Sequence, residues 1–235
     1  MKMISKSLMI AEIFCCLYAC KKTGTNTYTP SASINVTNAV IGGKTLIYNG
    51  TLQSVSVNSN NLLPVLAGQQ QIDLYTPAVA ATTTSPAIPS VYYYNQPLNV
   101  TDKSNYSLFL TGASPSAVDA VLITETYKDY TDSVSGVRFI NLSPGSGSIS
   151  VDIQGNPNGS ENTGLEYKTY SGFKQYPATV TAQNAGFTFE FRDSASGNLL
   201  ATYSYTPVTF HNVTLAVTGM ESSANILQVN DLSNY

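Results

Sequence analysis

Tryptophan is absent from this chain, histidine occurs once, and only 11% of the residues are charged. The single histidine, His211, rules out sites built from several histidine ligands, and a lone histidine is most often a structural or surface residue. A serine hydrolase would need this histidine together with a carboxylate and a nucleophile turn, but no G-x-S-x-G sequence occurs. We therefore expect no catalytic residue and no enzyme activity.

The charged residues form no cluster typical of a reactive site. Glycoside hydrolysis requires two carboxylates across a cleft, and the nearest approach to such a pair, Asp129 and Asp132, is interpreted as solvated linker charge. Calcium loops need several acids at alternate positions, and the turn at 193–197 has one. The eleven basic residues are scattered, so no face could neutralise a run of phosphates. We expect no metal, no cofactor and no nucleic-acid partner.

All three cysteines lie within the first twenty residues. In this segment Lys2 and Lys6 precede an apolar run that is too short to span a bilayer and that ends in Leu-Tyr-Ala-Cys. Glu12 is an unusual charge inside the run. The segment nevertheless resembles a bacterial lipoprotein signal peptide, 1–19, followed by the lipid-bearing Cys20. The alternative interpretation is a buried N-terminal helix.

The resemblance implies cleavage before Cys20, which would carry a diacylglyceryl thioether and an N-acyl chain. Two or more chains anchor a protein stably, so the membrane is the first predicted partner. Cleavage would leave no other cysteine, which excludes disulfides, thiol catalysis and cysteine-bound zinc in the mature chain. No aspartate follows Cys20, which favours the outer membrane, while the sequence favours neither its periplasmic nor its extracellular face. Residues 20–31 are small and polar and predict a tether.

The rest of the chain contains an internal repeat. Two segments recur in the same order at offsets of 106 and 107 residues: SINVT at 33–37 as FINLS at 139–143, and NYSLFLTG at 105–112 as NVTLAVTG at 212–219. A unit of this length is a domain and not a solenoid repeat. We place the first domain at 32–132 and the second at 136–235, with the joint at 132–136.

Within each unit the side chains alternate with a period of two. Residues 187–192 (FTFEFR) predict a strand with three phenylalanines on one face. A turn cluster at 193–198 and a run at 199–205 complete a predicted hairpin. Further strands are predicted at 71–75, 91–94, 106–110, 118–124 and 213–217. No segment shows a sustained helical period.

Many short strands separated by turns, in a chain rich in Thr, Ser, Asn, Val and Tyr, predict an all-β fold. The expected architecture is two tandem immunoglobulin-like antiparallel β-sandwich domains. The Cys/Trp/Cys core of antibody domains is absent, so the likeness concerns architecture only. Two long loops, 78–89 and 155–164, interrupt the strands, and loops of this size in compact sandwiches are either mobile or functional.

The second unit also resembles a known family. VRFINLSP at 137–144, followed by VDI at 151–153, looks like the opening of the domain of unknown function 4397, whose members begin with an R-x-x-N-x-S-P strand and a V-D-V strand. The resemblance covers 137–220, and the first unit departs from it at Thr37-Asn38. It implies an immunoglobulin-like sandwich of exported, commonly lipid-anchored proteins of Bacteroidetes-type bacteria. It implies no activity.

Tyrosine is the residue type that most invites a functional interpretation, since sixteen are present. Consecutive tyrosines at 92–94 lie in a predicted strand, in which the first and third would share one face, and a second aromatic cluster follows at 167–176. Flat phenol rings stack on sugars and anchor protein partners; the alternative is aromatic packing on an edge strand. The candidate ligand-binding residues are Tyr92, Tyr93, Tyr94, Tyr167, Tyr170 and Tyr176.

These features predict a non-catalytic, lipid-anchored envelope protein that binds a glycan or another envelope protein at the cell surface. One alternative is a structural spacer or assembly component of an outer-membrane complex that has no ligand of its own. A hydrolase is the third. Asp132-Ser133-Val134 and Asp193-Ser194-Ala195 resemble the short O-glycosylation motif of Bacteroidetes-type envelopes, so Ser133 and Ser194 are candidate modification sites.

Overall fold

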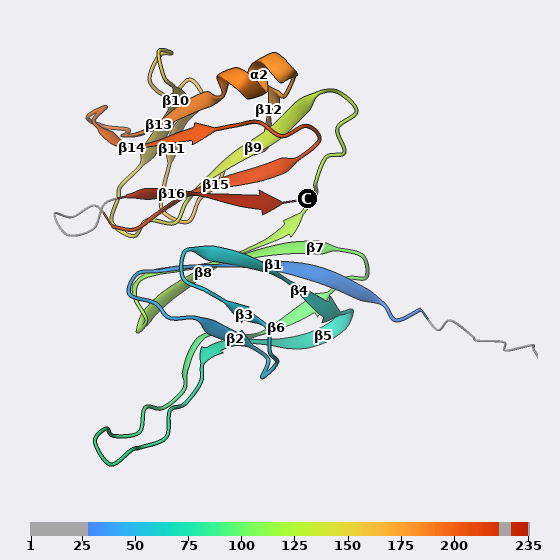
Figure 1. Cartoon of the computed structure of the whole chain (residues 1–235), viewed down its shortest axis with the longest axis vertical. Coiled ribbons are helices and arrows are strands. Elements are labelled where there is room, and N and C mark those ends of the chain that lie inside the picture. The colour runs from blue at the N-terminus through green and yellow to red at the C-terminus, as the bar shows by residue number, and fades with distance from the viewer. Residues whose placement is uncertain (1–27, 221–226, 235) are drawn as a thin grey trace, which may run out of the picture.

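The computed structural model describes residues 28–220 and 227–234. This part of the chain forms two stacked β-sandwiches (Figure 1), which confirms the predicted all-β class. The predicted signal peptide, Cys20 and most of the predicted tether lie outside the described residues. The helix α2 (Val180–Ala185) has Thr179 as its N-cap, and the Thr179 hydroxyl accepts a hydrogen bond from the Ala182 N–H. No helix within the two described ranges is long and apolar enough to cross a membrane.

The first sandwich consists of two four-stranded sheets. We call the sheet that faces the second sandwich the inner sheet; its order is β4-β1-β7-β8, and the outer sheet has the order β3-β2-β5-β6. The inner strands are β1 (Ser31–Val40), β4 (Ser59–Leu66), β7 (Asn105–Ser114) and β8 (Ala117–Glu125). The outer strands are β2 (Leu46–Tyr48), β3 (Ser54–Val55), β5 (Gly68–Thr76) and β6 (Val91–Val100). All four strands predicted for this unit are present.

The second sandwich repeats this arrangement, with an inner sheet of order β12-β9-β15-β16 and an outer sheet of order β11-β10-β13-β14. The inner strands are β9 (Val134–Asn141), β12 (Lys174–Pro177), β15 (Asn212–Thr218) and β16 (Gln228–Asn234). The outer strands are β10 (Ile149–Ile153), β11 (Asn162–Leu165), β13 (Phe187–Asp193) and β14 (Leu199–Tyr205). The strands β13 and β14 form the predicted hairpin, and β9 already begins inside the predicted joint.

Each sandwich contains one parallel pair of strands at the centre of its inner sheet. In the first, β1 pairs with β7 and places Asn38 opposite Leu110; in the second, β9 pairs with β15 and places Asn141 opposite Val217. The sequence match at an offset of 107 residues therefore aligns β7 with β15 correctly. The match at an offset of 106 residues aligns β1 with β9 three residues out of register. The equivalent of Asn141 is Asn38, at an offset of 103, and the SINVT match placed Asn35 there instead.

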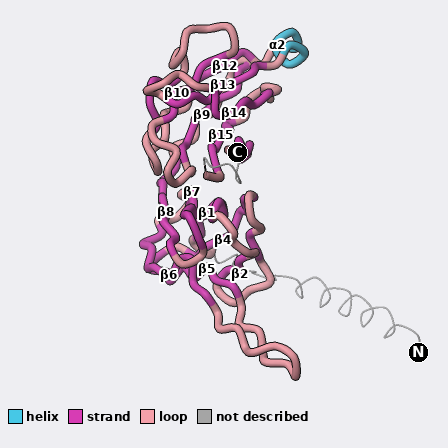
Figure 2. The backbone as a smooth tube through the Cα atoms, turned by 90° about the vertical axis from the view of Figure 1, so that its left-hand side faces the viewer, coloured by secondary structure: helices cyan, strands magenta, loops and turns pink. Residues whose placement is uncertain are grey.

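The inner sheets pack face to face and form a third core between the sandwiches. Side chains on β1, β7 and β8 meet side chains from β9, β15, β16 and the turn after β9: Ala39, Phe109, Ile123, Ile140, Leu142, Ala216 and Leu232. Both faces of the central strands are consequently covered, and β15 is buried at every residue. Small side chains between the valines of β15, such as Ala216, let the sheets approach closely. Figure 2 shows the resulting stack of four sheets.

A long arm extends from the outer sheet of the first sandwich, at the end away from the second (Figure 1). The arm is the predicted loop between β5 and β6. A bridge between Val79 and Ile88 and a turn closed by Thr82 and Ser85 order its backbone. The other predicted loop, 155–164, ends as part of β11 and is tied to the outer sheet by a hydrogen bond from Ser150 to Asn158 of 2.6 Å.

Candidate functional site: the cleft at the junction of the two sandwiches

Arg138 projects from β9 toward the first sandwich and is the centre of the junction. Its Nη1 and Nη2 atoms donate to both carboxylate oxygens of Glu125, at 2.9 and 2.5 Å, and its Nε donates to the Thr214 hydroxyl at 2.8 Å. The Arg138 and Glu125 side chains are only 3% and 2% exposed. A bidentate pair with this burial fixes the orientation of one sandwich relative to the other.

Aromatic rings surround the same guanidinium group. The ring centroids of Phe173, Tyr170 and Phe109 lie 4.8, 5.8 and 5.8 Å from its central carbon. Phe109 belongs to the first sandwich, and the other two belong to the second. Cation–π contacts of this kind add to the ion pair, because the guanidinium is desolvated.

The segment between β11 and β12 carries Tyr170 and Phe173 into place. Its backbone continues the edge of β9: Ser171 donates its N–H to the Phe139 carbonyl at 2.9 Å, and Asn141 donates to the Thr169 carbonyl at 3.1 Å. Because this segment is hydrogen-bonded to a strand of the inner sheet, its backbone holds the Tyr170 and Phe173 rings at the junction.

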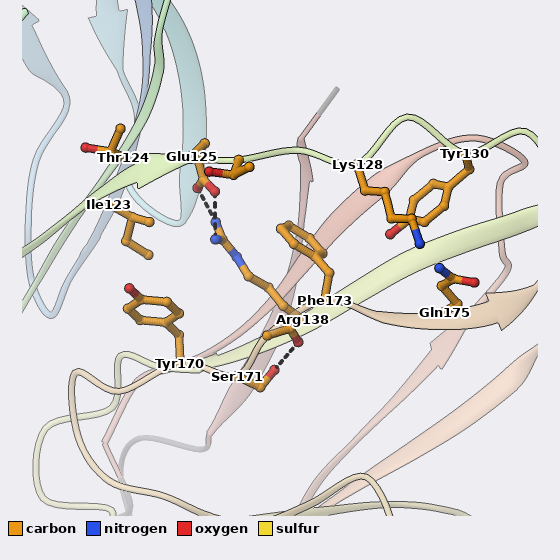
Figure 3. Close-up of a pocket in the computed structure, with 12 residues that line it drawn as sticks. Ile123, Thr124, Glu125, Lys128, Tyr130, Arg138, Tyr170, Ser171, Phe173 and Gln175 are labelled. Atoms are coloured by element: carbon orange, nitrogen blue, oxygen red, sulfur yellow. Dashed lines mark hydrogen bonds and ion pairs between the residues drawn. The ribbon is translucent and has the colours of Figure 1, made fainter. Parts of the chain in front are cut away.

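The linker between the sandwiches lies on the other side of Arg138 from Tyr170 (Figure 3). The Lys128 carbonyl accepts a hydrogen bond from the Asn212 side chain at 3.1 Å. The Tyr130 hydroxyl lies over Gly136, where an added Cβ would come within 2.1 Å of the phenol oxygen. A larger residue at 136 would force Tyr130 to move. Burial raises the pKa of Tyr130.

Between these walls lies a shallow cleft of about 420 Å³ (Figure 3). Residues from β8, the linker, β9, the segment after β11 and β12 line it: Ile123, Thr124, Glu125, Thr126, Lys128, Tyr130, Arg138, Tyr170, Ser171, Gly172, Phe173 and Gln175. Figure 3 places Tyr170 on one side of Arg138 and Lys128 with Gln175 on the other. An exposed ring, hydroxyls, an amide and an ammonium group therefore face one open space.

The charged residues of the cleft differ in whether another protein group already pairs with them. Glu125 and Arg138 engage each other, so Glu125 is not a free general acid and Arg138 has its nitrogens occupied. Among the described residues, no ion pair involves Lys128, whose ammonium lies 5.7 Å from the Tyr130 ring centroid. The geometry suits non-covalent binding through stacking and hydrogen bonds.

The first tyrosine cluster does not adopt the predicted alternation. A β-bulge in the β5–β6 pairing leaves Tyr93 out of register, so Tyr75 lies opposite Tyr92 and Leu74 opposite Tyr94. Tyr93 is buried and Tyr94 packs against the same core, while Tyr92 is 52% exposed. The Tyr92 ring packs against Tyr75 in a tilted arrangement, with centroids 5.1 Å apart. The prediction that Tyr92 and Tyr94 share a face is wrong, because the bulge inserts an extra residue.

The second tyrosine cluster separates into three roles. Tyr176 lies in the core of the second sandwich, 3% exposed, with its hydroxyl donating to Glu161. Burial and the Glu161 carboxylate raise its pKa. Tyr167 reaches across the junction and donates to Asp119 at 3.1 Å. Tyr170, 47% exposed, lines the cleft. Burial removes Tyr93 and Tyr176 from the candidate ligand-binding set.

The other candidate residues lie outside the cleft lining. Asp129, Asp132 and Ser133 are exposed in the linker. His211 is exposed, and its Nδ1 lies 2.9 Å from the Thr209 carbonyl oxygen. Ser194 is half-buried, and its hydroxyl is directed at the Thr163 carbonyl at 3.3 Å. Within the part of the chain that the structure describes, no group of three or more His, Cys, Asp or Glu side chains could hold a metal ion.

The residues that carry the family resemblance have structural positions. Arg138 joins the sandwiches, and Asn141 is fully buried, where it accepts from the Ser143 N–H at 2.9 Å and donates to the Leu165 carbonyl at 3.0 Å. Asp152 is buried in the outer sheet beside Arg192, 3.5 Å from its Nε. In this chain, Arg138, Asn141 and Asp152 therefore act in packing and hydrogen bonding.

The sequence did not indicate Glu125, Arg138, Lys128 and Phe173 as a group, and the nearby Asp129 and Asp132 were interpreted only as solvated linker charge. Glu125 and Arg138 lie on β8 and β9, whereas Lys128 and Phe173 lie between strands, and the stacking of the inner sheets brings Glu125 of the first sandwich to Arg138 of the second. One signal was available: Arg138 lies among the apolar residues Val137, Phe139 and Ile140, and charges on buried strands are almost always paired.

In comparisons with known proteins, no family model matches the chain, and no curated protein matches it significantly. The resemblance to the domain of unknown function 4397 therefore stays a prediction.

Proposed function

We propose that the protein is a non-catalytic recognition module of the cell envelope, and that the cleft at the junction of the two sandwiches binds a glycan. The observation that supports this most is Tyr170, a 47% exposed ring held on a rigid backbone beside several hydrogen-bonding groups. A flat ring with polar neighbours is suited to the apolar face and the hydroxyls of a sugar. The cleft is open to solvent and is not an enclosed cavity, which suits a chain better than a small enclosed ligand.

The test is a glycan array probed with the full-length chain and with two variants. Tyr170→Ala removes the cleft ring, and Tyr92→Ala removes a tyrosine of similar exposure, 52%, from the far side of the first sandwich. The proposal expects binding that Tyr170→Ala abolishes and Tyr92→Ala preserves, with both variants melting close to the wild type. Binding that depends on Tyr92 alone, or binding only to an envelope protein, would overturn the assignment of the cleft to a glycan.

A structural spacer is the second candidate, and the core between the sandwiches favours it. Phe109, Ile140 and Leu142 are each no more than 2% exposed in that core, so the two sandwiches form a fixed unit that could hold partners at a set distance. A spacer predicts that the wild type binds nothing on the array. The glycan array therefore distinguishes the recognition module from the spacer.

The proposed location is the outer membrane, with the body held by lipid on Cys20. This proposal rests on the N-terminal sequence alone. Palmitate labelling of the wild type and of Cys20→Ala, combined with protease treatment of intact cells, tests the anchor and its orientation together. Mass spectrometry of the purified protein tests O-glycosylation; the exposure of Ser133 and the half-burial of Ser194 lead us to expect modification of Ser133 first.

A further inference from the structure

We infer that the ligand of the junction cleft is acidic: an oligosaccharide that carries a carboxylate, such as a uronic acid chain. The inference rests on the proposed glycan-binding function and specifies its substrate class. It starts from the charges in the lining, which are two cations, Arg138 and Lys128, and one anion, Glu125. The lining is therefore net positive, although the whole chain has a formal charge of -3.

Only one of these charges is available to a ligand. The guanidinium of Arg138 is bonded to Glu125 and Thr214 through all three nitrogens and is 3% exposed. Lys128 is exposed, and within residues 28–220 and 227–234 no ion pair involves it. An ammonium group without a protein carboxylate can pair with a carboxylate on a ligand.

The arrangement of the cleft sets where that carboxylate would lie. Tyr170 and Lys128 are on opposite sides of Arg138 (Figure 3), so a ligand stacked on Tyr170 must extend along the cleft to reach the ammonium. Gln175 and Tyr130 lie near the Lys128 end. The preferred ligand is therefore a short chain with its acid group one or more sugar units away from the stacked ring.

The experiment compares one oligosaccharide in two forms, a uronic acid trisaccharide and its carboxyl-reduced neutral counterpart, by calorimetric titration of the full-length protein. We expect the acidic form to bind about fivefold more tightly at low ionic strength, because the contact involves an exposed ammonium group, and the preference to shrink as salt is added. Lys128→Gln should equalise the two forms. The matched control is Lys103→Gln, since the Lys103 ammonium also lies over a tyrosine ring, Tyr28, at 5.4 Å, but outside the cleft.

The outcomes distinguish failure of the acidic preference from failure of the proposed glycan binding. Equal binding of both forms by the wild type overturns the acidic preference and leaves glycan binding intact. A preference that survives in Lys128→Gln also overturns it, because the charge would then act from elsewhere. Failure of both forms to bind, together with a blank array, counts against the proposed function itself.

Discussion

Arg138 and Glu125 belong to different sandwiches, and together they form the most buried ion pair at the junction, with the two side chains 3% and 2% exposed. A second pair, Lys168 with Asp119, also joins the sandwiches, but its side chains are 40% and 46% exposed. Buried pairs are costly to break because the remaining partner stays desolvated, whereas exposed pairs contribute little. The two pairs therefore provide an internal comparison.

We expect Arg138→Leu to lower the free energy of unfolding by about 3–5 kcal/mol, since it leaves the Glu125 carboxylate buried without its partner. Lys168→Ala, which leaves the hydrogen bond from Tyr167 to Asp119 in place, should cost no more than about 1 kcal/mol. Urea denaturation followed by circular dichroism measures both. If the two variants lose the same stability, the Arg138–Glu125 pair is not the main polar contact of the junction.

The two equivalent asparagines should differ in importance. Asn141 bonds to the Ser143 N–H and to the carbonyls of Gly147 and Leu165, whereas Asn38 donates to the Lys44 carbonyl and accepts from Val40 at 3.4 Å. Removing a buried side chain leaves its partners unsatisfied. Asn141→Ala should cost about 2–3 kcal/mol and Asn38→Ala about 1 kcal/mol. The reverse order in chemical denaturation would contradict the hydrogen-bond assignment.

The core between the sandwiches predicts that they unfold together. Ile140 faces this core and Val137 faces the core of the second sandwich. Ile140→Asp should separate the sandwiches, give two calorimetric transitions in place of one and expose residues 126–133 to protease. Val137→Asp should instead unfold the second sandwich itself. If the wild type already melts in two transitions, the sandwiches are not coupled by this core.

Alkaline pH should destabilise the protein through Tyr203. Burial, followed by the nearby Asp231 carboxylate, raises the pKa of Tyr203 to about 12, compared with about 10 in an unfolded chain. Below pH 10 the phenol is neutral in both states. Between pH 10 and 12 the unfolded chain releases its proton first, so stability falls as the pH rises. Melting temperatures from pH 9 to 11 should fall less steeply in Tyr203→Phe than in the wild type; equal slopes would contradict the assignment.

The sequence was sufficient for the all-β class and for most strands, because period-two alternation is a local signal. The hairpin of β13 and β14 was predicted with its turn, since three phenylalanines in alternation can face only one core. The alternation of Val213, Leu215 and Val217 was also correct. The pattern could not show that Thr214 and Ala216 between them are buried too, because their burial depends on the inner sheet of the first sandwich.

The errors have the same origin. The bulge at Tyr93 changes the face of the tyrosines without any glycine or proline to mark it. The three-residue error in the repeat arose because SINVT and FINLS look alike, although Ile34 packs in the core of the first sandwich and Ile140 between the sandwiches. The cleft was missed because its residues come from three separate stretches of the sequence, 123–130, Arg138 and 170–175. Of the tyrosines proposed from sequence, only Tyr170 lines it.

The most direct test of the account is to map where a glycan binds. Backbone amide shifts of the full-length chain would be recorded by NMR during titration with the strongest ligand from the array. The account predicts shifts confined to the lining of the cleft, with Gly172, Phe173, Thr126 and Lys128 among the largest, and no shift in the arm between β5 and β6. Shifts centred on the arm or on Tyr92, with the cleft unchanged, would contradict it.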